Sequence, residues 1–103
     1  MLFRSSEDDG SFWSDLAWVE TFRGEDDQAE KSFAHAIQVD PNDVMSRIGA
    51  GLLSERRTSE TEAIEQYAYA IAVSPRILDS QFFADLRSRS PEMAKAIDRK
   101  SVV

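Results

Sequence analysis

The sequence contains no cysteine, which excludes disulfide bridges, thiolate metal sites and a cysteine nucleophile. It has a single histidine, His35, and only four glycines, and it contains neither a G-x-S-x-G motif nor a glycine-rich phosphate loop. The acidic clusters at 7–9 and 25–27 lack the alternating ligands and central glycine of a calcium loop. These absences predict a protein that is not an enzyme and that binds no metal or other cofactor.

Long apolar runs and an excess of positive charge are missing as well. The longest apolar stretches are only a few residues, whereas a membrane span needs about 20, so neither a signal peptide nor a membrane anchor is expected. The net charge of −7 has the wrong sign for binding a phosphate backbone. The sequence therefore predicts a soluble protein with no nucleic-acid partner and no direct membrane insertion, and it leaves a cytoplasmic and a periplasmic location open.

The 103 residues are enough for one small domain, and their charge is unevenly divided along the chain. Residues 1–43 carry 11 acidic and 3 basic side chains, whereas residues 44–103 carry 8 and 9. This asymmetry favours a head-to-tail contact between copies of the chain. The alternative is an acidic face that is simply solvated, since exposed charges are screened beyond ~8 Å at physiological salt.

The main pattern in the chain is an internal repeat, in which residues 29–41 match residues 63–75. The two segments share an alanine, an aromatic residue, a second alanine and a proline at the same spacings. Steps of four and three residues place the alanines and the aromatic residue on one helical stripe, and the proline ends the helix. The matching residues are Ala29, Phe33, Ala36 and Pro41 in the first copy, and Ala63, Tyr67, Ala70 and Pro75 in the second.

The hydrophobic pattern and the capping signals predict an all-α fold. Candidate N-caps occur at Asn42–Asp43, at Asp79–Ser80 and at Ser59, which forms a capping box with Glu62. Gly49 and Gly51 are expected to allow close helix packing. An acidic flexible segment (1–9) and a loose end (102–103) are expected to flank helices near residues 11–23, 26–39, 43–56, 60–73, 79–89 and 91–99.

These residues resemble the tetratricopeptide repeat (TPR), a helix-turn-helix unit of about 34 residues, which is also the spacing between the two copies. The resemblance implies two full units, 10–43 and 44–77, and a partial third unit or capping helices over 78–103, stacked as a short superhelix. The first unit also matches the family at Trp13, Leu16 and Ala17. In the second unit, Arg47 and Ala50 stand where large apolar residues are usual, so its first helix is expected to pack more weakly.

The resemblance further implies that the first helix of each unit lines a concave groove. Its residues are apolar rather than charged, and Ser14 and Trp18 occupy places where chaperone-binding members grip a carboxylate. The implied function is a non-catalytic module that binds an apolar peptide or helix, and Trp18→Ala is expected to abolish binding without loss of helicity. The alternative is that these side chains pack against a C-terminal helix or a further repeat. The groove positions are Trp18, Phe22, Met45, Ile48, Leu52, Phe82 and Leu86.

Two other expectations concern the assembly in which this chain acts. Residues 74–83 resemble the segment that closes the TPR tails of bacterial membrane polysaccharide ligases or polymerases of the O-antigen ligase type. That resemblance implies a structural or regulatory tail of a larger protein. Repeat stacks normally need about three units, so two units and a partial third are expected to be stabilised in one of two ways. Either the C-terminal helices cap the stack, or a homo-oligomer forms through its open end.

Overall fold

The computed structural model describes residues 10–57 and 59–101, and this part of the chain is all-helical, as the sequence predicts. The expected flexible segment 1–9 and the expected loose end 102–103 lie outside the described residues. The described helices are α1 (Gly10–Phe22), α2 (Asp26–Val39), α3 (Val44–Arg57), α4 (Glu60–Val73), the 3₁₀ helix η2 (Pro75–Asp79), α5 (Gln81–Arg89) and α6 (Pro91–Ser101).

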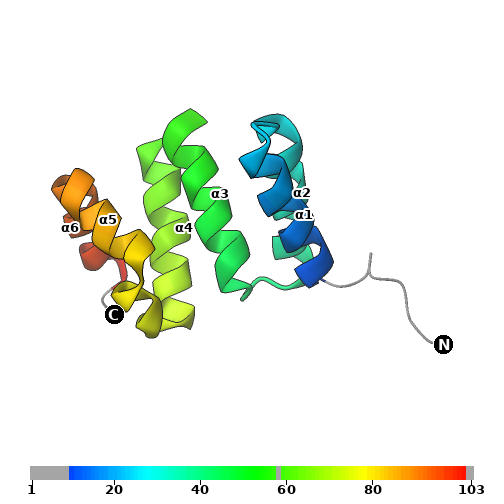
Figure 1. The fold of residues 1–103 in the computed structure, drawn as a ribbon. Helices are drawn as coiled ribbons and strands as arrows, with labels where there is room; N and C mark the ends of the chain where they lie inside the picture. Colours follow the sequence, from blue (N-terminus) through cyan, green and yellow to red (C-terminus); the bar gives the residue numbers. More distant parts are fainter. Residues whose placement is uncertain (1–9, 58, 102–103) are drawn as a thin grey trace.

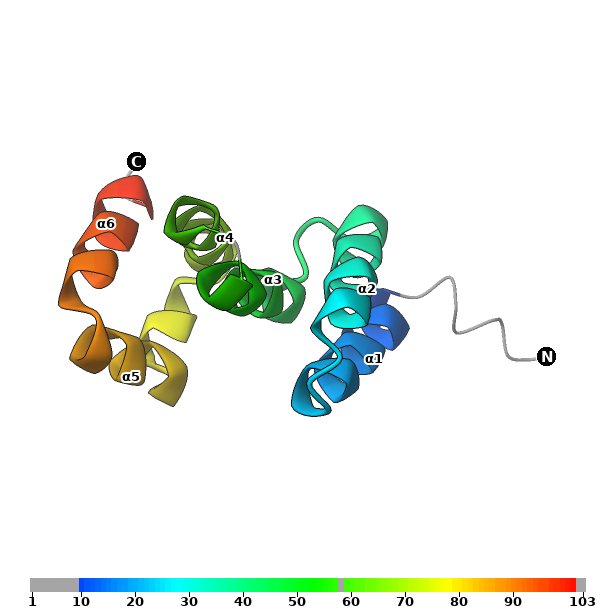
Figure 2. The same cartoon turned by 90° about the horizontal axis from the view of Figure 1, so that it is seen from above.

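The helices form three pairs in a row, α1 with α2, α3 with α4, and α5 with α6 (Figure 1). The row is elongated, with principal extents of 48 × 29 × 21 Å. Viewed from above, α1 and α5 lie toward one side of the row and α2 and α6 toward the other (Figure 2). The pairs are joined by contacts of α2 with α3 and of α4 with α6, so α3 and α4 form the centre of the molecule.

The helix bounds repeat with the period of the sequence. Helices α1 and α3 begin one repeat length apart, at Gly10 and Val44, and α2 and α4 both begin and end one repeat length apart. The arrangement departs from the prediction at Pro75, where the chain forms η2, and α5 begins at Gln81 rather than near residue 79. The last pair is also shorter than the others, with 9 residues in α5 and 11 in α6.

The turn between α1 and α2 depends on Gly24, which has a φ of +78°. The Gly24 amide donates to the carbonyl oxygen of Thr21 at 3.1 Å, and the Glu25 amide donates to that of Glu20 at 2.8 Å. This pair of bonds is a Schellman motif, which needs a left-handed residue and therefore favours glycine. The motif turns the chain back so that α2 packs along α1.

Side-chain caps begin the later helices where the sequence predicts them. The Ser59 hydroxyl oxygen accepts hydrogen bonds from the amides of Thr61 (3.1 Å) and Glu62 (3.3 Å) at the start of α4. At the start of α3, the Asp43 carboxylate accepts from both the amide and the hydroxyl of Ser46. These bonds satisfy amides that have no partner inside the helix.

Two aromatic rings hold α3 between its neighbours. Phe33 of α2 and Tyr67 of α4 are fully buried, and each ring lies against a glycine of α3. A Cβ atom at Gly49 would overlap Cζ of Phe33, and one at Gly51 would lie 2.5 Å from Cε1 of Tyr67. The close-packing interpretation of these glycines is therefore confirmed.

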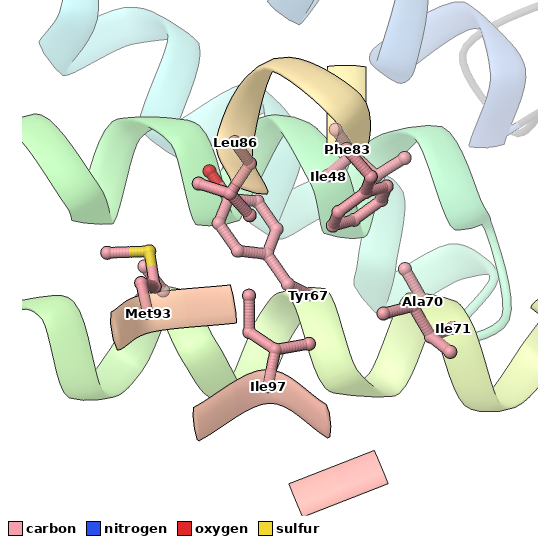
Figure 3. Packing of buried hydrophobic residues seen from close by; sticks show 9 residues of the cluster. Ile48, Tyr67, Ala70, Ile71, Phe83, Leu86, Met93 and Ile97 are labelled. Atoms are coloured by element: carbon pink, nitrogen blue, oxygen red, sulfur yellow. The ribbon is translucent and has the colours of Figure 1, made fainter. Parts of the chain in front are cut away.

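The core consists of two clusters, and Tyr67 lies in the larger one (Figure 3). The Tyr67 ring makes edge-on contacts with Phe82 and Phe83, with centroids 5.5 and 5.7 Å apart. Trp18 packs against both clusters and so connects the first helical pair to the rest. The smaller cluster contains Ala17, Ala29, Phe33 and Leu53, and the larger one contains Ile48, Ala63, Tyr67, Ala70, Ile71, Phe83, Leu86, Met93 and Ile97.

Glu55 ties three helices together at the edge of the larger cluster. Its Oε1 accepts hydrogen bonds from the Tyr67 hydroxyl at 2.8 Å and from Arg89 Nη2 at 3.2 Å, and its Oε2 pairs with Arg89 Nη1. Burial by itself raises the pKa of Glu55, but the bonds from Arg89 and Tyr67 outweigh it and leave that pKa lowered. Burial and the bond to Glu55 raise the pKa of Tyr67 above its usual range.

We expect Gly49→Ala to destabilise the fold, although alanine normally favours a helix by about 1 kcal/mol over glycine. The added methyl group overlaps the buried Phe33 ring, and overpacking of this kind costs about 1–3 kcal/mol. Urea unfolding followed by circular dichroism measures the free-energy change.

The control for this prediction is the double variant Gly49→Ala with Phe33→Leu. Because leucine removes the ring atoms that the methyl group meets, the Gly49→Ala change should be less harmful in that background. Equal effects of Gly49→Ala in both backgrounds would show that the ring does not contact this glycine.

Glu55→Gln should lower the stability by about 1 kcal/mol at pH 7, because it removes the charge that binds Arg89. The folded-state pKa of Glu55 lies below its ordinary value of 4.5, so the stabilisation is present above pH 4.5 and is lost as the pH falls through the folded-state pKa. Urea unfolding of both proteins at several pH values measures the difference, which should shrink toward acid. Glu65→Gln, at the exposed pair with Lys100, is the control, and a pH-independent difference for Glu55→Gln would contradict the assignment.

Candidate functional site

The structure divides the seven predicted groove residues by their exposure. Phe22, at the end of α1, has 82% of its surface exposed, and Met45, at the start of α3, has 52%. Leu52 is half-buried on α3. These three side chains are at least partly exposed, and Phe22 is the most exposed large apolar residue of the described chain.

Ile48 and Leu86 are core residues, which corrects their prediction as groove residues. Their exposed fractions are 6% and 1%, and both lie in the cluster around Tyr67. Ile48 follows Met45 by three positions, which is about 60° short of a full helical turn, and this rotation directs it toward the core. Leu86 lies in the core because α5 and α6 pack together over Tyr67 (Figure 3).

Trp18 and Phe82 are half-buried and support the core. The Trp18 ring meets Phe33 edge-on at a centroid distance of 5.2 Å and lies 6.0 Å from the ring of Phe22. Its indole Nε1 is buried and has no hydrogen-bond partner among the described residues. Trp18→Ala would therefore remove core packing, so the expectation that it leaves the helices intact is not supported. Ser14, the other residue compared with a carboxylate clamp, is also buried.

We call the exposed or half-buried side chains of Phe22 on α1 and of Met45 and Leu52 on α3 the α1–α3 apolar face. Helices α1 and α3 run in the same direction, so Met45 lies toward one end of this face and Phe22 toward the other (Figure 1). Because these side chains are spread along two helices, they suit contact with an extended or helical segment better than with a small molecule.

Arg47 makes a different kind of contact from the apolar residue that the repeat pattern favours at its position. Its guanidinium lies 3.8 Å from the centroid of the Tyr69 ring. Its Nε donates to the Pro41 carbonyl oxygen at 3.0 Å, and its Nη1 donates to Oε1 of Gln66 at 3.1 Å. Arg47 thus ties α3 to α4 through hydrogen bonds and a cation–π contact.

A hollow that the sequence analysis does not predict lies between α2 and α4, over α3. Its volume is about 200 Å³, and its floor is formed by Ala50 and Ser54. The sequence does carry a signal for it, because Ala50 stands where the repeat pattern has leucine. The hollow itself depends on how closely α2 and α4 flank that position, which the pattern does not specify.

The polar groups of the described residues show no arrangement suited to metal chemistry. Within residues 10–57 and 59–101, no group of three or more His, Asp or Glu side chains is placed to hold a metal ion. The exposed imidazole of His35 stacks on Trp13 with a centroid distance of 4.0 Å.

None of the helices in this part of the chain combines the length and hydropathy needed to cross a membrane.

Comparison with known proteins assigns this chain to no family. No protein-family model matches the chain, and neither the curated proteins nor the solved structures contain a match. The assignment of a function therefore rests on the geometry of the chain itself.

Proposed function

We propose that this chain is a non-catalytic protein–protein interaction module of the TPR type, which binds an apolar peptide or helix along the α1–α3 apolar face. The proposal rests on the exposure of Phe22 and Met45, at 82% and 52%. Burial of a phenylalanine side chain contributes about 1.5–3 kcal/mol, so a partner that covers Phe22 gains binding energy from it. Aromatic anchors of this kind dominate many protein interfaces.

The repeat period supports the TPR part of the proposal. The equivalent helices begin one repeat length apart, and the equivalent packing residues are all fully buried. These residues are Ala29, Phe33 and Ala36 in α2, and Ala63, Tyr67 and Ala70 in α4.

Rigidity of the helical array supports the binding part of the proposal. Met45 and Leu52 extend from α3, whose backbone is fixed by the buried rings of Phe33 and Tyr67. A preformed face loses little conformational entropy on binding, so more of the contact energy appears as affinity.

A second copy of the chain is also a proposed partner, through the open end at α1. Val19 of this helix is half exposed, whereas α6 at the other end of the row exposes Glu92, Lys95 and Arg99. The exposed side of α6 is polar, whereas that of α1 includes the apolar Val19, which offers a second copy a surface to bind.

We expect Phe22→Ala to weaken peptide binding by about 10-fold, because it removes about 1.4 kcal/mol or more of buried apolar contact. Peptides selected from a displayed random library on the immobilised chain serve as ligands, and fluorescence anisotropy measures their affinities at a protein concentration where sedimentation shows a monomer. Helicity should not change, since the Phe22 side chain is largely exposed.

The matched control is Val39→Ala, which shortens an exposed apolar side chain on α2. It should change the affinity by less than about twofold, because α2 does not contribute to the α1–α3 apolar face. Selected peptides that bind the wild type and Phe22→Ala equally well, or a selection that enriches no apolar peptide, would contradict the proposed function.

A further inference from the structure

A second surface lies on the opposite face of α3 from Met45. Ser54 follows Met45 by nine positions, which is two and a half helical turns, so the two side chains leave opposite sides of the helix. Ser54 and Ala50 form the floor of the hollow between α2 and α4. Ala34 and Ile37 of α2 provide an apolar wall beside this floor.

The hollow exists because α3 has short side chains at this place. Ala50 and Ser54 occupy the positions that Leu16 and Glu20 occupy in α1, one repeat earlier. An alanine in place of a leucine leaves space that the surroundings fill only in part. The backbone of α3 cannot shift to close this space, because its glycines already touch the buried aromatic rings of α2 and α4.

The polar groups that line the hollow are acidic or neutral. They include the carboxylates of Glu30 on α2 and Glu62 on α4, and none of the lining residues is basic. Glu30 accepts a hydrogen bond from Arg57 at 3.2 Å. A carboxylate offers about four lone-pair sites, so it can accept hydrogen bonds from a ligand in addition to those it already has.

The hollow has an acidic end, near the first turns of α2 and α4, where the charge favours a cation. Helices α2 and α4 run in the same direction, so their acidic first turns lie along the same edge of the row of helices (Figure 1). Five carboxylates there outnumber two guanidinium groups, which are already paired with three of the carboxylates, and the remaining negative charge attracts cations. The carboxylates belong to Asp26, Asp27, Glu30, Glu60 and Glu62, and the guanidinium groups to Arg56 and Arg57.

Arg47 makes the electrostatic potential differ between the two ends of the hollow. Its guanidinium binds Gln66 and lies over Tyr69, at the end of α3 away from Arg57. Arg47 repels a second cation at that end, whereas carboxylates outnumber the guanidinium groups of Arg56 and Arg57 at the end where the acidic first turns of α2 and α4 lie. The apolar surface of the alanines that line the hollow suits the methylene stem of a long basic side chain.

We propose that this hollow binds an arginine side chain of a basic peptide segment, with its stem on Ala34 and Ala50 and its guanidinium toward Glu30 and Glu62. Arginine is favoured over lysine because its planar, weakly hydrated guanidinium presents five N–H donors and can bind a carboxylate through two of them. The site is separate from the α1–α3 apolar face and does not depend on the proposed function.

The test is a titration of the ¹⁵N-labelled chain with acetyl-Gly-Arg-Gly-amide, followed by the amide shifts in ¹H–¹⁵N spectra. The shifts should saturate and concentrate at Ala34, Ala50, Ser54 and Gln66. A peptide with citrulline in place of arginine has nearly the same shape without the charge, and it should bind at least about 10-fold more weakly. The lysine peptide should bind several-fold more weakly than the arginine peptide.

Ala50→Leu is the variant that decides the assignment, because it fills the hollow and leaves every charge in place. It should weaken binding of the arginine peptide at least about 10-fold while keeping the helical spectrum. Ser54→Leu fills the same space from the next turn and replaces Ala50→Leu if that variant does not fold. Glu62→Gln should also weaken binding, whereas Glu92→Gln on α6 should not.

Three results would overturn the proposal. The first is unchanged binding of the arginine peptide to the folded variant with the filled hollow. The second is equal binding of the citrulline or lysine peptide, which would remove the role of the guanidinium. The third is a set of shifts that spreads over the acidic surface or concentrates at Phe22 and Met45, which would place the ligand elsewhere.

Discussion

The contact of two aromatic rings with the backbone of α3 is the constraint on which the rest of the structure depends. Phe33 reaches α3 from one side at Gly49, and Tyr67 reaches it from the other side at Gly51. Only glycine leaves room for these contacts, so α2 and α4 approach the central helix closely and fix its rotation about its own axis. That rotation decides which side chains of α3 are buried and which face solvent.

Two faces of α3 with different chemistry follow from this rotation. Met45 and Leu52 extend the apolar side of the molecule, whereas Ala50 and Ser54 lie beneath the acidic hollow. The same rotation brings Glu55 to the hydroxyl of the buried tyrosine of α4 and to the guanidinium at the end of α5, so the third helical pair is held by a charged bond as well as by apolar packing. We therefore regard α3 as the element that positions both proposed binding surfaces.

The sequence predicts the six helices closely, since their signals are local: prolines after α2 and α4, Gly24 after α1, and serine or aspartate caps. It does not predict η2, because proline is compatible with both an open turn and a short 3₁₀ helix. Of the predicted groove residues, the structure leaves Phe22 and Met45 exposed and buries Ile48 and Leu86. The resemblance to the repeat family implies that Ile48 lines the groove with Met45, but packing directs Ile48 inward. The hollow depends on space between helices that no residue pattern records.

The contact of the two rings with α3 is tested most directly by a nuclear Overhauser spectrum of the protein in solution. The resonances to examine are those of the α-protons of Gly49 and Gly51. If the two rings contact α3 at its glycines, the Gly49 protons show cross-peaks to the Phe33 ring, and the Gly51 protons show cross-peaks to the Tyr67 ring. Ring currents should also move these resonances upfield. Glycine resonances at ordinary helical positions without such cross-peaks would mean that α3 is not held in this way, and both faces assigned to it would lose their basis.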